Sequence, residues 1–301
     1  MDKIFKTAFT LIELLVVIAI IGILSGLIVV TMNGVTQKAN IAKAQVFSSS
    51  LRNALMLDML SEWKFDQINY PSNNQTPDLW GGKTGTLYGS AGPQNLPQLQ
   101  TSGCVSGNCL LFDGDDDYVQ TTLCVGSRAN NITIDGWVYT SGGTMQAIFA
   151  EQGSWTQGAR LYIDSNNILR FIVFNGTTYE GFEVTSPFAN YLNKWTYIAV
   201  TFKYLSEGNS PMAIYINGEL KQSAVRTSGA PNPATTNAQI GVWGDTSYNF
   251  NGKIDDIRVY NAILPTSMIK EQYYSGLNNL LSSGNISNAE YQSRLSIISK
   301  K

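Results

Sequence analysis

The sequence predicts a long N-terminal α-helix, transmembrane in its first half, joined to an all-β sandwich and followed by a short C-terminal helical hairpin. Three observations lead to this prediction. From Phe9 to Met32 the chain is predominantly apolar, and its only ionisable side chain is that of Glu13. After Glu62 it changes to short apolar and aromatic runs separated by Gly, Asn, Asp and Ser, a texture typical of β-sheets. Helical spacing returns in residues 277–301.

The composition excludes two classes of function. The 301 residues include 20 Lys and Arg against 22 Asp and Glu, for a net charge of -2. The chain therefore lacks the concentrated basic face that nucleic-acid binding needs. It contains no histidine, which removes the commonest general base and the commonest metal ligand. We therefore expect no nucleic-acid partner and no catalysis by a nucleophile paired with histidine.

The N-terminal segment is long enough to be a membrane helix. About 20 apolar residues can cross a bilayer, and the run from Phe9 to Met32 reaches that length. Lys3 and Lys6 precede it with one acid, Asp2, so the positive-inside rule keeps the leader cytoplasmic and sends the rest of the chain outward. A cleaved secretory signal is an alternative, but no convincing small-x-small site follows the apolar core. A simple anchor is another, and it leaves the burial of Glu13, which costs about 2.5–3.5 kcal/mol, unexplained.

The helical pattern continues beyond the membrane segment, over residues 9–61 in all. Apolar residues recur at helical spacing from Val35 to Leu55, and no proline interrupts the chain before Pro71. Such a helix would be roughly 80 Å long at ~1.5 Å per residue. Its outer half is amphipathic, so one face is expected to lie against a folded domain or against neighbouring copies.

The N-terminus resembles a known family. The stretch KTAFTLIELLVVIAIIGIL, starting at Lys6, combines a short basic leader, a small residue, Phe and a Glu four positions later. It resembles the N-terminus of type IV pilins and pseudopilins, which implies that a prepilin peptidase cuts between Ala8 and Phe9 and that the new amino group of Phe9 is methylated. Residues 1–8 would then be the leader. The family usually has Gly where this chain has Ala8, whose side chain is still small enough for a tight cleavage pocket.

The same resemblance gives Glu13 a role in assembly. It implies that this carboxylate meets the N-terminal ammonium of a neighbouring subunit. An ion pair between subunits would offset the burial cost of Glu13 and set the axial register of the packed helices.

Residues 62–276 are expected to form one β domain outside the cytoplasm. Their candidate strands are short and nearly evenly spaced, as in a sandwich rather than an α/β fold. Asn217 and Gly218 suit the two-residue turn of a hairpin. The candidate strands are WKF, CLLFD, YVQTT, ITIDGWVY, QAIFA, RLYID, LRFIVFN, YEGFEV, KWTYIAVTF, MAIYIN, AQIGVW and KIDDIRVY.

The order of these segments resembles the LamG-like, concanavalin A-like jelly roll. The segments are WKFD at 63–66, LFDGDDDYV at 111–119, ITIDGWVY at 132–139, NKWTYIAVTF at 193–202, IYINGEL at 214–220 and NGKIDDIRVYNAIL at 251–264. The resemblance implies that the first and last strands pair. The family binds carbohydrates and proteins, and some members are glucanases, so a glycan or protein ligand is expected, although a fold alone does not determine function.

No enzymatic activity is expected. A glycosidase needs two carboxylates on one face of a strand, at i, i+2 spacing, and the Glu-x-Asp-x-x-Glu strand of the glucanases is missing. Glu180 and Glu183 are three residues apart, and Asp255 and Asp256 are adjacent, so each pair would point to opposite faces. A membrane-tethered carbohydrate-active enzyme is the least favoured alternative.

Two acidic segments suggest one structural calcium ion, a cation that prefers clustered oxygens. Four aspartates lie in one turn: Asp113, Asp115, Asp116 and Asp117. This turn lacks the glycine and bidentate glutamate of an EF-hand, and a solvated Asp/Gly turn is the favoured interpretation of Asp115 and Asp116. Related jelly rolls often hold calcium where the first and last strands meet, which implicates Asp66 with either Asp255 or Asp256.

Three aromatic residues are candidates for a glycan surface, because exposed rings stack on sugars. They are Trp155, Trp243 and Tyr248. The alternative for each is a place in the core, where aromatic residues of a sandwich usually lie. Trp155 is the strongest candidate because Gly, Ser and Gln flank it, as in a loop.

The cysteines allow one disulfide. Cys104 and Cys109 bracket a small loop containing glycine, and in an exported domain this spacing predicts a local disulfide. Cys124 is left over and is expected to be a small buried residue.

The tail at residues 277–301 returns to helical patterning. Ser287 and Glu290 have the spacing of a capping box, and Gly284 can end the preceding helix. The arrangement resembles short helical hairpins at the C-termini of some bacterial proteins that are suspected of mediating oligomerisation. A polar tail packed loosely on the sandwich is the alternative.

The leading hypothesis is a type IV pilin-like filament subunit that displays a lectin-like domain for adhesion or ligand binding. The runner-up is a pseudopilin of a secretion system. Either reading places the protein in the cytoplasmic membrane as a single-pass chain before assembly. Afterwards it would lie in an extracellular pilus or a periplasmic pseudopilus.

Overall fold

The computed structural model describes the globular part of the chain almost continuously and the N-terminal part only in pieces. It covers residues 11–12, 14–22, 43, 46, 50, 58–68, 74–90, 95–125, 130–151, 156–176, 181–206, 208–226, 230–244 and 248–299. The chain divides into two compact units, residues 1–49 and residues 50–301.

Within the first unit, residues 11–12 and 14–22 are helical. No helix in the described part of the chain is both long and apolar enough to cross a membrane. Ala8, Phe9 and Glu13 lie outside the described residues, so their predicted roles in cleavage, methylation and assembly stay predictions.

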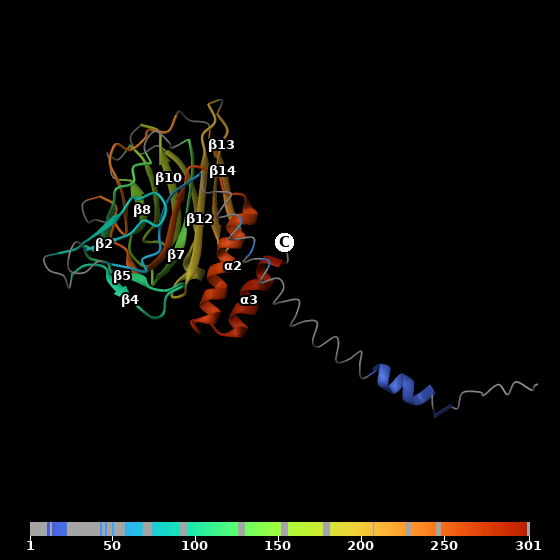
Figure 1. Ribbon diagram of the computed structural model, residues 1–301. Helices are drawn as coiled ribbons and strands as arrows, with labels where there is room; N and C mark the ends of the chain where they lie inside the picture. The colour runs from blue at the N-terminus through green and yellow to red at the C-terminus, as the bar shows by residue number, and fades with distance from the viewer. Residues whose placement is uncertain are drawn as a thin grey trace, which may run out of the picture. The chain divides into compact units, whose positions relative to one another are not determined.

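The second unit is built from strands and ends in two helices (Figure 1). The strands are β1 (Met59–Trp63), β2 (Gln75–Thr76), β3 (Gly85–Tyr88), β4 (Gln98–Gln100), β5 (Cys109–Asp113), β6 (Tyr118–Thr121), β7 (Asn131–Thr140), β8 (Gln146–Glu151), β9 (Ala159–Ile163), β10 (Ile168–Phe174), β11 (Gly181–Pro187), β12 (Thr196–Lys203), β13 (Ser210–Ile216), β14 (Glu219–Arg226), β15 (Ala238–Ile240) and β16 (Asn251–Tyr260). The α-helices are α2 (Thr266–Ser282) and α3 (Asn288–Ser299).

These strands form two antiparallel sheets. Sheet A has the order β14-β13-β12-β7-β16-β5-β4, with β1 also paired to β16, and sheet B has the order β11-β10-β9-β8-β15-β6-β3-β2. Alternate residues of each strand point inward, as period-2 geometry requires. The inward rows of the two sheets form one core that includes Phe112, Phe149, Phe171, Ile198 and Val259. The predicted all-β jelly roll is confirmed.

The first and last strands pair, as the family resemblance implies. Trp63 lies opposite Ile257 and Met59 opposite Tyr260. The expected strand WKFD is shifted, however, because β1 begins at Met59 and ends at Trp63. Its first residues overlap the end of the helix predicted for residues 9–61. Pairing with β16 overrides the helical pattern there, and the positive φ of Phe65, 58°, stops the strand on the other side.

One predicted turn has the expected geometry. Asn217 and Gly218, between β13 and β14, have φ angles of 53° and 76°. Positive φ at both central residues defines the type I′ turn that matches the twist of a hairpin. The sequence prediction of a hairpin at these two residues is confirmed.

The helices pack onto the outer side of sheet A. Figure 1 shows α2 and α3 side by side next to β12 and β14. Trp137 and Tyr197 from the sheet join Ile269, Tyr273 and Leu277 from α2 in a second buried cluster. The tail is therefore not loosely packed. Its helical part also begins at Thr266, eleven residues before the predicted boundary, because the apolar helical spacing extends back to Met268.

Candidate ligand-binding face

Two of the three carboxylates predicted to bind calcium where the first and last strands meet, Asp66 and Asp255, hold a loop. Asp66 Oδ1 accepts a hydrogen bond from the backbone N–H of Asn108 at 2.9 Å. Asp255 Oδ2 accepts from the N–H groups of Val105 and Ser106 at 2.9 and 3.1 Å. Both acids thus fix the segment between Cys104 and Cys109, which the structure joins by a disulfide with its Cα atoms 5.5 Å apart.

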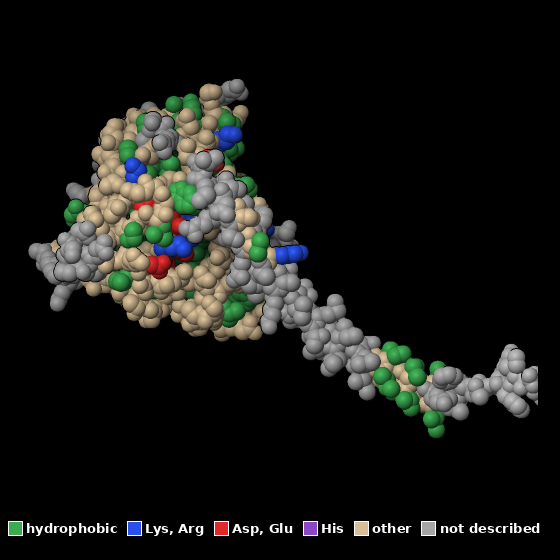
Figure 2. Space-filling model, viewed as in Figure 1, with side chains coloured by type: hydrophobic (Ala, Val, Ile, Leu, Met, Phe, Trp, Pro, Cys, Tyr) green, Lys and Arg blue, Asp and Glu red, His purple; other side chains and the backbone are tan. Residues whose placement is uncertain are grey.

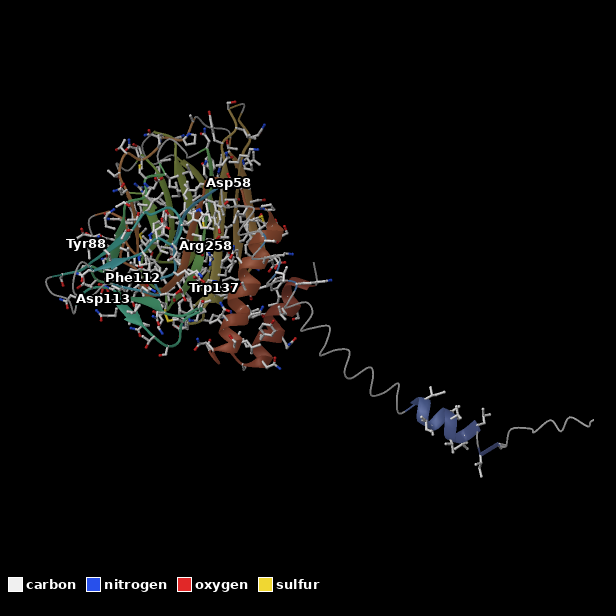
Figure 3. All side chains as sticks on the ribbon, in the orientation of Figure 1. Asp58, Tyr88, Phe112, Asp113, Trp137 and Arg258 are labelled. Atoms are coloured by element: carbon white, nitrogen blue, oxygen red, sulfur yellow. A yellow bond between two sulfur atoms is a disulfide. The ribbon has the colours of Figure 1, made fainter. Side chains whose placement is uncertain are left out.

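The neighbouring Asp256 belongs to an arginine network. Arg258 lies 2.9 Å from Glu62, 3.3 Å from Asp135 and 3.5 Å from Asp256. Figure 2 shows where charged side chains lie on the visible face of the molecule, and Figure 3 labels Arg258 within the sandwich, between Asp58 and Trp137. Because a guanidinium already supplies positive charge, this position fits calcium poorly, and calcium at Asp66 and Asp256 stays an untested prediction.

Burial of this network changes its acid–base properties. Asp135 is 1% exposed, and burial raises its pKa to about 7, although Arg258 opposes the shift. Burial also raises the pKa values of Asp255 and Asp256. The negative charge of Asp256 adds to the shift of Asp255, and those of Glu62 and Asp66 add to the shift of Asp256. The network therefore contains three carboxyl groups, those of Glu62, Asp135 and Asp256, around the one guanidinium of Arg258.

The acidic turn between β5 and β6 is arranged differently. One carboxylate oxygen from each of Asp113, Asp116 and Asp117 lies within 4.8 Å of the others, whereas Asp115 is outside this group. Burial raises the pKa of Asp117 to about 7, and the charges of Asp113, Asp116 and Asp115 add to the shift.

The aromatic candidates are more buried than the sequence suggested. Trp243 is 8% exposed, and its ring stacks on Tyr248 with centroids 4.6 Å apart. The guanidinium of Arg160 lies 4.1 Å from the centroid of Trp243 and 4.3 Å from that of Phe174. Trp243 thus packs against both a buried arginine and the ring of Tyr248, and it offers little free ring surface for a sugar. Trp155 lies outside the described residues.

Cys124 is exposed rather than buried. Its neighbours Leu123 and Val125 are 3% and 1% exposed. Because they point into the core, the alternation of an extended chain turns Cys124 outward.

The outer side of sheet B carries a group of side chains that the sequence did not reveal. Tyr88 on β3 stacks on Tyr118 on β6, with ring centroids 5.1 Å apart and planes 12° from parallel. Tyr88 remains 43% exposed. Gln120, two residues beyond Tyr118 on the same side of β6, accepts a hydrogen bond from Gln239 on β15 at 2.8 Å. We call Tyr88, Tyr118, Gln120 and Gln239 the tyrosine–glutamine strip.

A hollow adjoins this strip. It has a volume of about 400 Å³ and is lined by Gln120, Thr235, Thr236, Asn237 and Gln239. All five side chains are polar and uncharged. Hydroxyl and amide groups beside an exposed aromatic face can hydrogen-bond a sugar's hydroxyls while its ring stacks on the aromatic surface.

A larger hollow of about 630 Å³ lies on sheet A, with Met212, Leu220, Val225 and Ile263 among its walls. Asn261, which also lines this hollow, donates its N–H to the carbonyl of Asp58 at 2.7 Å. The hollow on sheet B is the better candidate for a ligand.

The sequence did not predict the tyrosine–glutamine strip, because its residues come from strands that are far apart in the chain. Strand β3 has only four residues, GTLY, and lies beside glycines. It was not among the candidate strands. The signal that could have found the site is the alternation of YVQT, in which Tyr118 and Gln120 share the side of β6 opposite the buried Val119 and Thr121.

Comparison with known proteins agrees with this architecture. Residues 113–270, more than half of the chain, match the model of the Concanavalin A-like lectin/glucanases superfamily. The domain of botulinum neurotoxin serotype D described as its binding domain has a similar fold. It gives a TM-score of 0.57 at 17% identity, over 74% of this chain and 53% of that chain. A likeness at this identity concerns the fold alone.

The N-terminus matches different proteins. Residues 6–29 match the model of the prokaryotic N-terminal methylation motif. The type II secretion system core protein G of Escherichia coli (strain K12) is 45% identical over 70 residues, 23% of this chain and 45% of the relative. That of Aeromonas hydrophila is 41% identical over 78 residues, 26% of this chain and 51% of the relative.

The chain thus spans about half the length of the curated relatives it matches. The two sets of matches describe successive parts of one molecule, a pilin-like N-terminus and a lectin-like domain. The chain belongs to the Concanavalin A-like lectin/glucanases superfamily and carries a prokaryotic N-terminal methylation motif ahead of that domain.

Proposed function

We propose that this protein is a subunit of a type IV pilin-like filament that displays its jelly roll as a ligand-binding domain. The observation that supports this most is the presence of a methylation motif at residues 6–29 and a lectin-like domain at residues 113–270 in one chain. The first would serve assembly and the second would serve recognition. The protein acts by binding and not by catalysis.

Assembly would follow from three N-terminal residues. A prepilin peptidase cuts between Ala8 and Phe9 while the apolar segment lies in the cytoplasmic membrane, and Phe9 is then methylated. The carboxylate of Glu13 pairs with the ammonium of Phe9 in a neighbouring subunit, because an unpaired charge at membrane depth is unfavourable. The jelly roll faces away from the cytoplasm throughout.

Replacing Glu13 tests the assembly step. We expect Glu13→Ala to abolish or strongly reduce incorporation into filaments, while circular dichroism shows an unchanged β domain. Thr10→Ala, in the same apolar segment, is the control and should assemble normally. Normal incorporation of Glu13→Ala would contradict the assembly role.

Recognition is proposed to use the tyrosine–glutamine strip. Its exposed ring and uncharged polar hollow suit a neutral oligosaccharide. We would pass the purified full-length protein in detergent over an array that includes hexamers of glucose, galactose and N-acetylglucosamine. Tyr118→Ala is expected to abolish retention, whereas Tyr139→Ala, an exposed tyrosine on sheet A, should leave it unchanged. Equal retention of both variants would contradict this site.

A pseudopilin of a secretion system is the second candidate. It is favoured by the match to type II secretion system core protein G from two bacteria. Electron microscopy of the source cells with an antibody against the jelly roll separates the two proposals. Labelled extracellular filaments support a pilus, whereas label confined to the periplasm supports a pseudopilus.

A further inference from the structure

The turn between β5 and β6 gathers negative charge that no described basic side chain balances. Asp113 closes β5, and Asp116 and Asp117 lead into β6. One carboxylate oxygen of each lies within 4.8 Å of the other two. Within the described residues, no lysine or arginine forms an ion pair with any of these three acids, although such pairs occur elsewhere in the domain.

Asp117 provides a second and separate observation. Its side chain is 3% exposed. Its Oδ2 accepts a hydrogen bond from the backbone N–H of Asp113 at 3.0 Å. Its Oδ1 is buried and has no hydrogen-bond partner among the described residues. A buried oxygen without a partner costs roughly 1–3 kcal/mol, and more when it carries charge.

The three acids also differ in exposure in a way that suits a bound ion. Asp117 is buried, Asp116 is half-buried and Asp113 is exposed. The group is therefore closed on one side and open to solvent on the other, so water can complete the coordination of an ion that enters from outside. A set of carboxylate oxygens without nitrogen or sulfur is typical of calcium, which binds six to eight oxygens at about 2.3–2.6 Å.

We propose that Asp113, Asp116 and Asp117 bind one calcium ion at this turn. The ion neutralises the three carboxylates, satisfies the buried Oδ1 of Asp117 and stabilises the start of β6. The site is separate from Asp66 and Asp256, and it does not depend on the proposed filament function. Figure 3 shows Asp113 on the side of the sandwich opposite α2, in the region of Tyr88.

Calcium titration of the full-length protein in detergent tests this site. After treatment with a chelator, the melting temperature is measured with calcium chloride up to about 10 mM, above the ~10⁻³ M dissociation constants of weak extracellular calcium modules. We expect the wild type and Asp115→Asn to gain several degrees. Asp115 is the matched control because it lies in the same turn but outside the group of three.

Asp116→Asn and Asp117→Asn should lose this gain or need at least tenfold more calcium. Circular dichroism without calcium checks that both variants fold, and Asp116→Asn carries the test if Asp117→Asn does not. No shift for the wild type would overturn the proposal. The proposal would also be overturned if a folded Asp116→Asn variant gained as much melting temperature from calcium as the wild type. The same holds if Asp66→Asn abolished the calcium-induced gain while Asp116→Asn kept it.

Discussion

The outer sides of the two sheets have the same pleated geometry but different neighbours. On sheet A, Trp137 and Tyr197 are buried beneath α2. On sheet B, Tyr88 and Tyr118 stack on each other, and Tyr88 keeps 43% of its surface exposed. Figure 3 shows Trp137 near α2 and Tyr88 on the opposite side of the sandwich. The buried aromatic residues beneath α2 therefore hold the fold together, whereas those of the strip are free to contact a ligand.

The largest expected effect is that of Trp137→Ala. Trp137 packs on Tyr197 and Tyr273 with ring centroids 5.4 and 5.7 Å away. Truncating a buried tryptophan costs about 3–5 kcal/mol, and here it also separates α2 from the sheet. Urea unfolding of the full-length protein in detergent measures the loss. Single substitutions destabilise proteins by about 1 kcal/mol on average. A smaller cost for Trp137→Ala would contradict the claim that the aromatic residues beneath α2 hold the fold together.

Gly276→Ala should have the next largest effect. A Cβ atom at this position of α2 would lie 2.4 Å from the ring of Trp137. The helix must move away from the sheet, at a cost of about 1–3 kcal/mol for overpacking. Ser275→Ala, one residue earlier and partly exposed, is the control and should change stability by less than about 0.5 kcal/mol. Equal stabilities of the two variants would contradict the close contact.

The buried acids of sheet A should make stability depend on pH. The pKa of Asp135 rises from an ordinary value of 3.8 to about 7 in the folded protein. The folded state therefore favours the protonated, neutral form of Asp135. The resulting contribution to the free energy of unfolding is complete below pH 3.8 and is lost as the pH rises toward 7.

Comparing the wild type with Asp135→Asn isolates this contribution. The difference in unfolding free energy should change in favour of the Asn variant between pH 4 and pH 7, measured by urea midpoints, since Asn cannot ionise. A difference that is constant over this range would show that Asp135 ionises at its ordinary pKa.

The smallest expected effect on stability is that of Tyr88→Ala. Substitutions at exposed positions usually change stability by less than about 0.5 kcal/mol, and the loss of one stacked pair adds about 0.5–1.5 kcal/mol at most. Thermal unfolding of Tyr88→Ala beside Trp137→Ala measures the contrast between the faces directly. A larger loss for Tyr88→Ala would assign the strip to the fold and not to a ligand.

The sequence predicted those features that depend on residues close together in the chain. The turn at Asn217 and Gly218 follows from the preference of these residues for positive φ. The loop closed by Cys104 and Cys109 follows from their spacing. Features set by long-range pairing were harder to predict. The position of β1 depends on β16, which lies almost two hundred residues away.

The candidate site shows the same limit. Trp243 and Tyr248 do lie together, as two aromatic residues in one loop suggest, but a buried Arg160 from β9 occupies the space beside the indole. The stack of Tyr88 on Tyr118 requires two strands that are thirty residues apart to pair in one register. No local pattern encodes that pairing, although the alternation within β6 places Tyr118 and Gln120 on one side.

Both faces of the jelly roll matter to the proposed function only if the domain is displayed by an assembled subunit. Mass spectrometry of the protein purified with its assembly from the source cells tests this most directly. The expected result is a chain that begins at N-methylated Phe9 and is recovered with many other copies. A chain that still begins at Met1 and is recovered only as single copies in the membrane would contradict the proposal.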